Sequence, residues 1–228
     1  MSHIYIPYES EAFPPSTVTN GSDELNIDLN DVLHSAITVG RASYSEIFRH
    51  GLSSGFEAIF RWSLVKMSLE PIVIGGKQYL RRTDALRSMD PSERGAVNYF
   101  LGMTFCKLFA ARLLDTPWLL HFDVFKNVLL YGLIDRSKPD LVGLQSGTGK
   151  WLAFESKGRS RRPSQIAKAK AKTQAQQLVH LEGSACDLEI ATFSYFQADV
   201  LRFYWCDPEP LDAIPIEIPN PGFAWEYY

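Results

Sequence analysis

The stretch that decides the fold is PDLVGLQSGTGKWLAFESKG, residues 139–158. It contains two runs typical of β-strands, Asp140 to Gln145 and Trp151 to Ser156, and the glycine-rich sequence SGTGK joins them. A connection of this composition predicts an antiparallel hairpin. Because Trp151 to Phe154 is wholly apolar, the second strand is expected to be buried, with charged residues emerging at its end.

Three charged side chains are expected to meet at this end of the hairpin. Side chains alternate along a strand, so Glu155 and Lys157 point to one side and Ser156 to the other. Antiparallel pairing through residues 146–149 places Asp140 beside them. The sequence therefore predicts two carboxylates and an ammonium in close proximity. An ordinary salt bridge at the edge of a sheet is the alternative interpretation.

The elements around the hairpin predict an α/β fold with a mixed central sheet flanked by helices. Asp90 is a suitable N-cap and Pro91 a suitable first residue for a long helix, and Glu93 completes a pattern that resembles a capping box. The further expected elements are a helix from Asp90 to about Leu114, a strand from Trp118 to Phe125, a helix from Pro163 or Ser164 to about Leu181, and strands at Leu188 to Phe196 and Val200 to Cys206.

The ends of the chain are expected to add to this core. Residues 1–30 lack periodicity and predict an extended arm or irregular cap, and residues 43–69 predict two short helices broken at Gly51 to Gly55. PIVIGGKQYL, residues 71–80, predicts a hairpin. We therefore divide the chain into a mostly helical N-terminal part (1–89), a core (90–206) and a proline-rich acidic C-terminal extension (207–228) that wraps the surface.

Composition favours one globular domain in the cytoplasm. The chain has 228 residues, of which 46% are hydrophobic and 21% charged. Its longest apolar run is far shorter than the roughly 20 residues of a membrane helix, so we expect no membrane contact. Three cysteines without CxxC spacing predict neither a disulfide framework nor a zinc site.

The charge is unevenly distributed. Residues 1–40 hold six acidic residues and residues 207–228 hold five, with no Lys or Arg in either segment. Because the net charge is −3, the middle of the chain carries +8. Seven basic residues and no acid fall in residues 157–172, which we call the basic run. The basic run predicts either an anion-binding surface or a solvated helix face.

Pro139-Asp140 and Glu155-Ser156-Lys157, followed by the basic run, resemble the motif of the PD-(D/E)xK (restriction-endonuclease-like) nucleases. The resemblance implies that Asp140, Glu155 and Lys157 are catalytic. Asp140, Glu155 and the Ser156 carbonyl would bind Mg²⁺ or Mn²⁺. It also implies a nucleic-acid partner, DNA, contacted through its phosphates by basic side chains. These are Arg159, Arg161, Arg162, Lys168 and Lys172.

The match to this family is incomplete. Many members add an acid from the helix before the sheet, and Glu93 is the candidate here, although helix capping also explains it. Gln174 is a candidate supporting residue on the following helix, which lacks the tyrosine that some members carry four residues later. The resemblance predicts a magnesium-dependent nuclease, as a homodimer or with a partner subunit in a defence or restriction system. A catalytically silent binding or assembly protein with the same fold is the alternative.

Overall fold

The computed structural model describes residues 3–127, 129, 131–133 and 138–207. The strands are β1 (Ile4–Glu11), β2 (Gly21–Ile27), β3 (Leu69–Ile74), β4 (Lys77–Arg82), β5 (Leu120–His121), β6 (Tyr131–Leu133), β7 (Leu141–Leu144), β8 (Trp151–Gly158), β9 (Leu178–Leu181), β10 (Ser184–Ala185), β11 (Leu188–Gln197) and β12 (Val200–Cys206). The helices are α1 (Leu29–Thr38), α2 (Tyr44–Ile47), α3 (Leu52–Ser68), α4 (Asp84–Ser88), α5 (Pro91–Leu113), α6 (Phe122–Phe125) and α7 (Gln165–Ala175).

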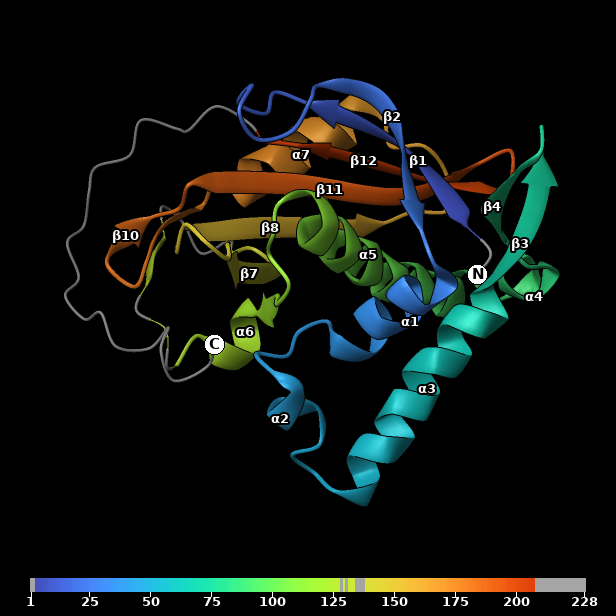
Figure 1. Ribbon diagram of the computed structural model, residues 1–228, viewed down its shortest axis with the longest axis horizontal. Coiled ribbons are helices and arrows are strands. Elements are labelled where there is room, and N and C mark those ends of the chain that lie inside the picture. The colour runs from blue at the N-terminus through green and yellow to red at the C-terminus, as the bar shows by residue number, and fades with distance from the viewer. Residues whose placement is uncertain (1–2, 128, 130, 134–137, 208–228) are drawn as a thin grey trace.

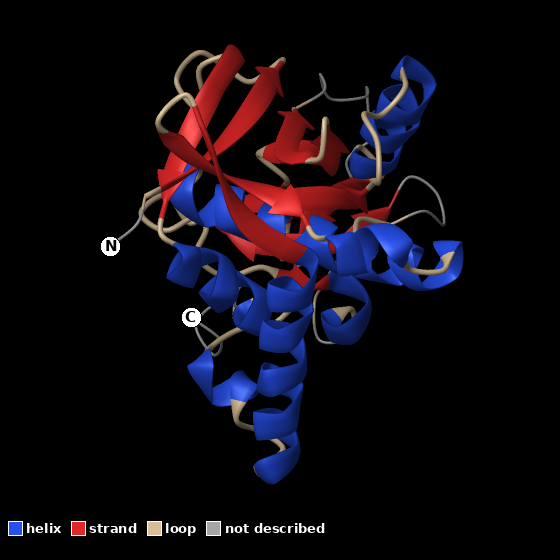
Figure 2. Ribbon diagram, turned by 90° about the vertical axis from the view of Figure 1, so that its right-hand side faces the viewer, coloured by secondary structure: helices blue, strands red, loops and turns tan. Residues whose placement is uncertain are grey.

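Nine strands form one mixed sheet, in the order β2-β1-β4-β12-β11-β8-β7-β5, with β3 paired to β4. Strands β8 and β11 are parallel, whereas β7 with β8 and β11 with β12 are antiparallel. Strands β10, β9 and β6 form a smaller sheet. Helices cover both faces of the large sheet (Figures 1 and 2). The predicted mixed α/β architecture is therefore confirmed.

Alternation along β11 assigns α5 and α7 to opposite faces of the sheet. Ile190 packs in the core cluster that contains most of α5, and its neighbour Ala191 packs with Ala171 and Ala175 of α7. Small alanine side chains let the α7 backbone lie close to the strands. The end of β8 is thus enclosed between two helices.

Helix α5 packs closely against the C-terminal end of β8. Its N-terminus is capped by Asp90, whose carboxylate accepts a hydrogen bond from the Ser92 amide at 2.8 Å. Further along, a Cβ atom at Gly158 would lie 1.5 Å from the Asn98 carbonyl oxygen, and one at Gly102 would lie 2.6 Å from the Gly158 nitrogen. Only glycine fits at these two positions, so they fix how α5 meets the strand that carries Glu155 and Lys157.

The hairpin that decides the fold has the expected register. Leu144 pairs with Trp151 and Leu141 with Phe154. Gly147 and Gly149 in the connection have positive φ angles of 75° and 67°, a conformation that favours glycine. The hairpin expected at residues 71–80 is confirmed, as β3 and β4. The helix break expected at Gly51 to Gly55 is confirmed only at Gly51, because Gly55 lies inside α3, a helix of 17 residues rather than a short one.

The N-terminal arm expected for residues 1–30 is wrong, because this segment forms two strands of the main sheet. Ile4, Ile6 and Tyr8 alternate inward along β1 and are buried. Strand β1 pairs with β2 on one side and with β12, in parallel, on the other. The N-terminal part thus contributes four strands as well as four helices, and its description as mostly helical needs this correction.

Two other expectations also fail. The strand expected from Trp118 to Phe125 is reduced to β5, after which the Phe122 amide bonds the Asp140 carbonyl at 3.1 Å and the chain turns into α6. The helix expected to reach Leu181 ends at Ala175, because Leu178 and Leu181 are buried in β9 beside β6. The wrapping expected of residues 208–228 concerns a segment outside the described residues. Among those described, no helix combines the length and apolarity of a membrane span.

Candidate active site

The β7–β8 register brings Asp140 to the end of β8. Leu141 lies opposite Phe154, so Asp140 comes next to Glu155. The Asp140 carboxylate accepts a hydrogen bond from the Ser156 amide, with 2.9 Å between Oδ2 and N. Lys157 Nζ forms an ion pair with Glu155 Oε1. The three side chains expected to converge from strand alternation are therefore together.

Burial makes this group electrostatically unusual. The Glu155 side chain is 2% exposed and that of Lys157 is 26% exposed. Burial, and then the neighbouring charge of Asp140, raises the pKa of Glu155 to about 7, although Lys157 acts in the opposite direction. Burial also raises the pKa of Asp140, against the Ser156 hydrogen bond and Lys157. A cation beside these two carboxyl groups would offset the cost of ionising them in a partly buried position.

The oxygen atoms at the site fit a hard divalent cation. Glu155 Oε2 is buried and has no hydrogen-bond partner among the described residues. The amide and carbonyl of one strand residue point to the same side, so the Ser156 carbonyl faces the side on which Asp140 lies. Carboxylate and carbonyl oxygens are the ligands that Mg²⁺ and Mn²⁺ prefer. Within the described part of the chain, no group of three or more His, Cys, Asp or Glu side chains is placed to hold a metal. The set is therefore two carboxylates and a main-chain oxygen.

Helix α5 places Tyr99 near the carboxylates, a residue that was not among the predicted site residues. Its backbone nitrogen would lie 3.0 Å from a Cβ atom at Gly158, and its side chain is half exposed. Burial raises the pKa of the Tyr99 phenol, as do the charges of Asp140, Glu155 and Asp123. In the described residues the hydroxyl has no hydrogen-bond partner. Residue patterns do not predict this placement, because it depends on how closely α5 packs against β8 at Gly102.

The two supporting candidates are not joined to this group. Glu93 lies in the first turn of α5 and lines an apolar groove between α3 and α5, together with Phe60 and Phe100. Gln174 lies in the last turn of α7 and, within the described residues, has no side-chain hydrogen bond to Asp140, Glu155 or Lys157. That Glu93 and Gln174 support catalysis therefore stays a prediction.

The basic run is divided into free and engaged cations. Arg159 and Arg161 are exposed and make no ion pair with a described residue. Arg162 binds Glu9 at 3.0 Å and Lys172 binds Glu11 at 2.9 Å, both on β1.

Lys168 is 8% exposed, and its Nζ lies 3.4 Å from the centroid of the Tyr204 ring. Burial lowers the pKa of Lys168. The Tyr204 hydroxyl donates to Glu11 at 2.5 Å, which joins this contact to the Glu11–Lys172 pair. Acidic residues near the N-terminus therefore contact part of the basic run.

Comparison of the chain with protein-family models, with curated proteins and with solved structures finds no match.

Proposed function

We propose that this protein is a metal-dependent nuclease with a restriction-endonuclease-like core, and that it hydrolyses phosphodiester bonds in DNA. The observation that carries the proposal is the meeting of Asp140, Glu155 and Lys157 at the end of a buried strand. Supporting it are Glu155 Oε2, which has no hydrogen-bond partner in the described part of the chain, and the cations that follow directly, Arg159 and Arg161, which form no ion pair there.

The site residues fit a Mg²⁺ or Mn²⁺ ion. Asp140, Glu155 and the Ser156 carbonyl would hold it. When bound, such an ion polarises a phosphate and lowers the pKa of an attached water molecule. The Ser156 amide fixes the Asp140 carboxylate in place, so this oxygen set is organised before substrate binds.

The remaining side chains act on the substrate. Lys157, partly exposed beside Glu155, offsets the negative charge that grows on the phosphate as water forms a new P–O bond and the bond to the leaving sugar oxygen breaks. The Tyr99 hydroxyl is free to donate a hydrogen bond to a phosphate oxygen. Arg159 and Arg161 contact phosphates along the strand, which orients DNA without reading its sequence.

The test is cleavage by the purified full chain. Plasmid DNA, single-stranded DNA and RNA are incubated with Mg²⁺ or Mn²⁺, for the wild type and for Asp140→Asn and Glu155→Gln. We expect cleavage that requires the metal and falls by roughly 10³-fold in both variants. Glu189→Gln is the matched control, because it makes the same change at a partly buried glutamate of the neighbouring strand that, among the described residues, forms no hydrogen bond or ion pair with Asp140, Glu155 or Lys157. Tyr99→Phe should retain activity at about one tenth.

A wild type that cleaves none of these substrates, alone or with the products of neighbouring genes, contradicts the proposal. If that inert protein binds DNA and Lys157→Ala binds it equally well, the chain is a silent binding or assembly protein. Those two outcomes separate the enzyme from its alternative.

A further inference from the structure

Over its first three turns helix α3 has polar side chains turned inward and apolar side chains turned outward, whereas Val65 near its end packs in the core. Arg61 donates to the carbonyl oxygens of Ala36 and Val39 at 3.0 and 3.1 Å, and Glu57 binds Arg61 and Arg41. These contacts attach the helix to α1 and the segment after it. Surface helices usually show the reverse arrangement, with apolar residues facing the core.

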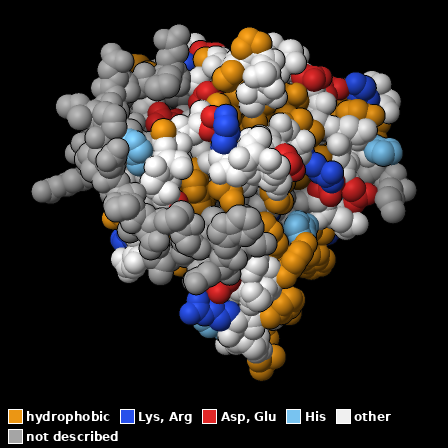
Figure 3. Space-filling model, turned by 60° about the vertical axis from the view of Figure 1, so that its left-hand side comes forward, with side chains coloured by type: hydrophobic (Ala, Val, Ile, Leu, Met, Phe, Trp, Pro, Cys, Tyr) orange, Lys and Arg blue, Asp and Glu red, His pale blue; other side chains and the backbone are white. Residues whose placement is uncertain are grey.

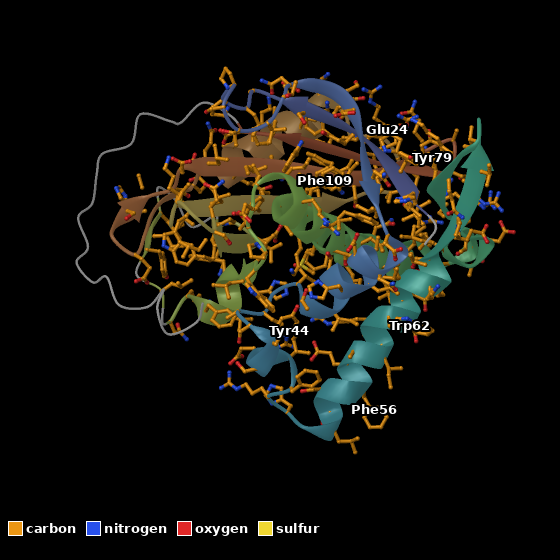
Figure 4. The ribbon with its side chains drawn as sticks, in the orientation of Figure 1. Glu24, Tyr44, Phe56, Trp62, Tyr79 and Phe109 are labelled. Atoms are coloured by element: carbon orange, nitrogen blue, oxygen red, sulfur yellow. The ribbon has the colours of Figure 1, made fainter. Side chains whose placement is uncertain are left out.

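The outward side is a continuous apolar stripe. Figure 4 shows Phe56 and Trp62 projecting from α3, and Figure 3 shows hydrophobic side chains along the projecting lower end of the molecule. At 100° per residue, positions 52, 56, 59, 60, 63 and 67 fall within an arc of about 100°. We call them the α3 stripe: Leu52, Phe56, Ile59, Phe60, Ser63 and Met67. The first four are 60–79% exposed.

The α3 stripe has a projection at one end and a groove at the other. Leu52 and Phe56 stand at the free N-terminal end. The apolar groove, about 630 Å³, lies at the C-terminal end, where Met67 of α3 faces Met89 and Phe100. The two features are about 15 Å apart on one helix face. A second copy with the opposite direction would therefore place each projection over the other copy's groove.

We propose that two copies of this chain associate through antiparallel α3 stripes about a two-fold axis between Ile59 and Phe60. In this register Leu52 faces Met67 of the second copy, Phe56 faces Ser63, and Ile59 faces Phe60. The bulky Phe56 thus meets the small Ser63, Leu52 meets Met67 at the groove, and each pair occurs twice, as a two-fold interface requires.

The distribution of charge on α3 favours a second copy of the chain, rather than a membrane surface, as the partner of the α3 stripe. Lys66 is the one charged residue among the exposed positions of α3, and in this register it faces Ser53. Self-association therefore brings no like charges together. A helix that lies on a membrane surface typically carries several basic residues on its polar face, which α3 lacks.

The first test is oligomeric state, which does not depend on nuclease activity. We expect a dimer of the full chain by light scattering at tens of micromolar concentration. Ile59→Glu sets carboxylates beside the two-fold axis and should weaken association at least about 100-fold. Val73→Glu is the control, since Val73 on β3 is 69% exposed and outside the stripe. Circular dichroism melting curves check that both variants are folded.

The second test is the register. A Phe56→Cys and Ser63→Cys double variant should form an interchain disulfide, whereas Phe56→Cys alone should not, because its two copies lie about 10 Å apart along the axis. A monomeric wild type overturns the proposal. Cross-linking by Phe56→Cys alone overturns the antiparallel arrangement, and a monomer that binds phospholipid vesicles through Phe56 assigns the stripe to a membrane surface instead.

Discussion

Two pairs of carboxyl groups that are partly or fully buried lie on the neighbouring parallel strands β8 and β11. Asp140 and Glu155 belong to the β7–β8 hairpin, and Glu189, near the start of β11, lies opposite Ala153 and beside Asp207. In each pair one carboxylate accepts a backbone amide at 2.9 Å, from Ser156 to Asp140 and from Glu189 to Asp207. Burial raises the pKa of both Glu155 and Glu189 to about 7.

The pairs differ in the cations around them. Lys157 binds Glu155 directly, and the basic run follows it. Near the second pair, Lys150 binds Asp187 at 2.6 Å, which leaves Glu189 beside the charge of Asp207. Burial and a raised pKa are thus shared by both pairs and do not identify a site. The placement of lysine and arginine beside the first pair is what favours it as the proposed active site.

The largest expected effect compares the two lysines. Lys157→Ala removes the ammonium beside Glu155. It should lower DNA cleavage by roughly 10³-fold, because the negative charge that grows on the phosphate is then no longer stabilised by a cation. Lys150→Ala breaks an exposed ion pair with Asp187 and should leave cleavage unchanged. Cleavage rates at saturating Mg²⁺ measure both. Equal loss in the two variants would remove the distinction between the two carboxyl pairs.

The next effect is stabilisation by metal. At a hundredfold excess over its dissociation constant, Mn²⁺ should stabilise the wild type by about 2.7 kcal/mol, since only the folded chain presents the site. Glu155→Gln should lose this stabilisation, whereas Glu189→Gln combined with Asp207→Asn should keep it. Thermal unfolding with and without Mn²⁺ gives the answer. Loss in the double variant would mean that the second pair binds the metal.

Local sequence predicted the first pair but gave no sign of the second. Asp140 and Glu155 are joined by one hairpin, and strand alternation with a glycine-rich turn suffices to bring them together. Glu189 and Asp207 meet through antiparallel pairing of β11 with β12, and Asp207 begins a proline-rich stretch that reads as an irregular tail. The contact between Glu189 and Asp207 depends on where β12 ends, and residue patterns do not predict strand ends to the residue.

The other failures have the same origin in long-range packing. Strand β1 pairs with β12 at the far end of the chain, so its short run of alternating residues around Pro7 carries too little local signal. Helical periodicity continued past Ala175, but Leu178 and Leu181 are buried in a sheet with β6, and tertiary contacts override helix propensity.

A smaller effect concerns pH. The pKa of Glu189 is raised to about 7 and that of Asp207 to about 6, so the folded state holds protons that the unfolded state releases. Their stabilising contribution is complete below the unfolded pKa values and is lost as pH rises through the folded ones. With chelator present, Glu189→Gln with Asp207→Asn should stabilise the protein by about 1–2 kcal/mol at pH 8 and much less at pH 4.5. Urea unfolding at both pH values is the measurement, and a gain independent of pH would contradict the assignment.

The smallest effect concerns the acids that engage the basic run beside the first pair. Deleting residues 1–30 would remove two strands of the sheet, so a single substitution is the cleaner change. Glu9→Gln releases Arg162 and should raise DNA affinity about threefold at low salt, with a steeper salt dependence because one more cation is free for phosphate.

Glu24→Gln is the matched control for this change. It removes the same charge, but Glu24 binds Lys77 and Tyr79 of β4 rather than a cation of the basic run. Fluorescence anisotropy with a labelled duplex over a salt series compares the two variants. If both raise affinity equally, net charge alone governs binding. If only Glu9→Gln does so, the Glu9–Arg162 contact limits the positive charge available beside Asp140 and Glu155.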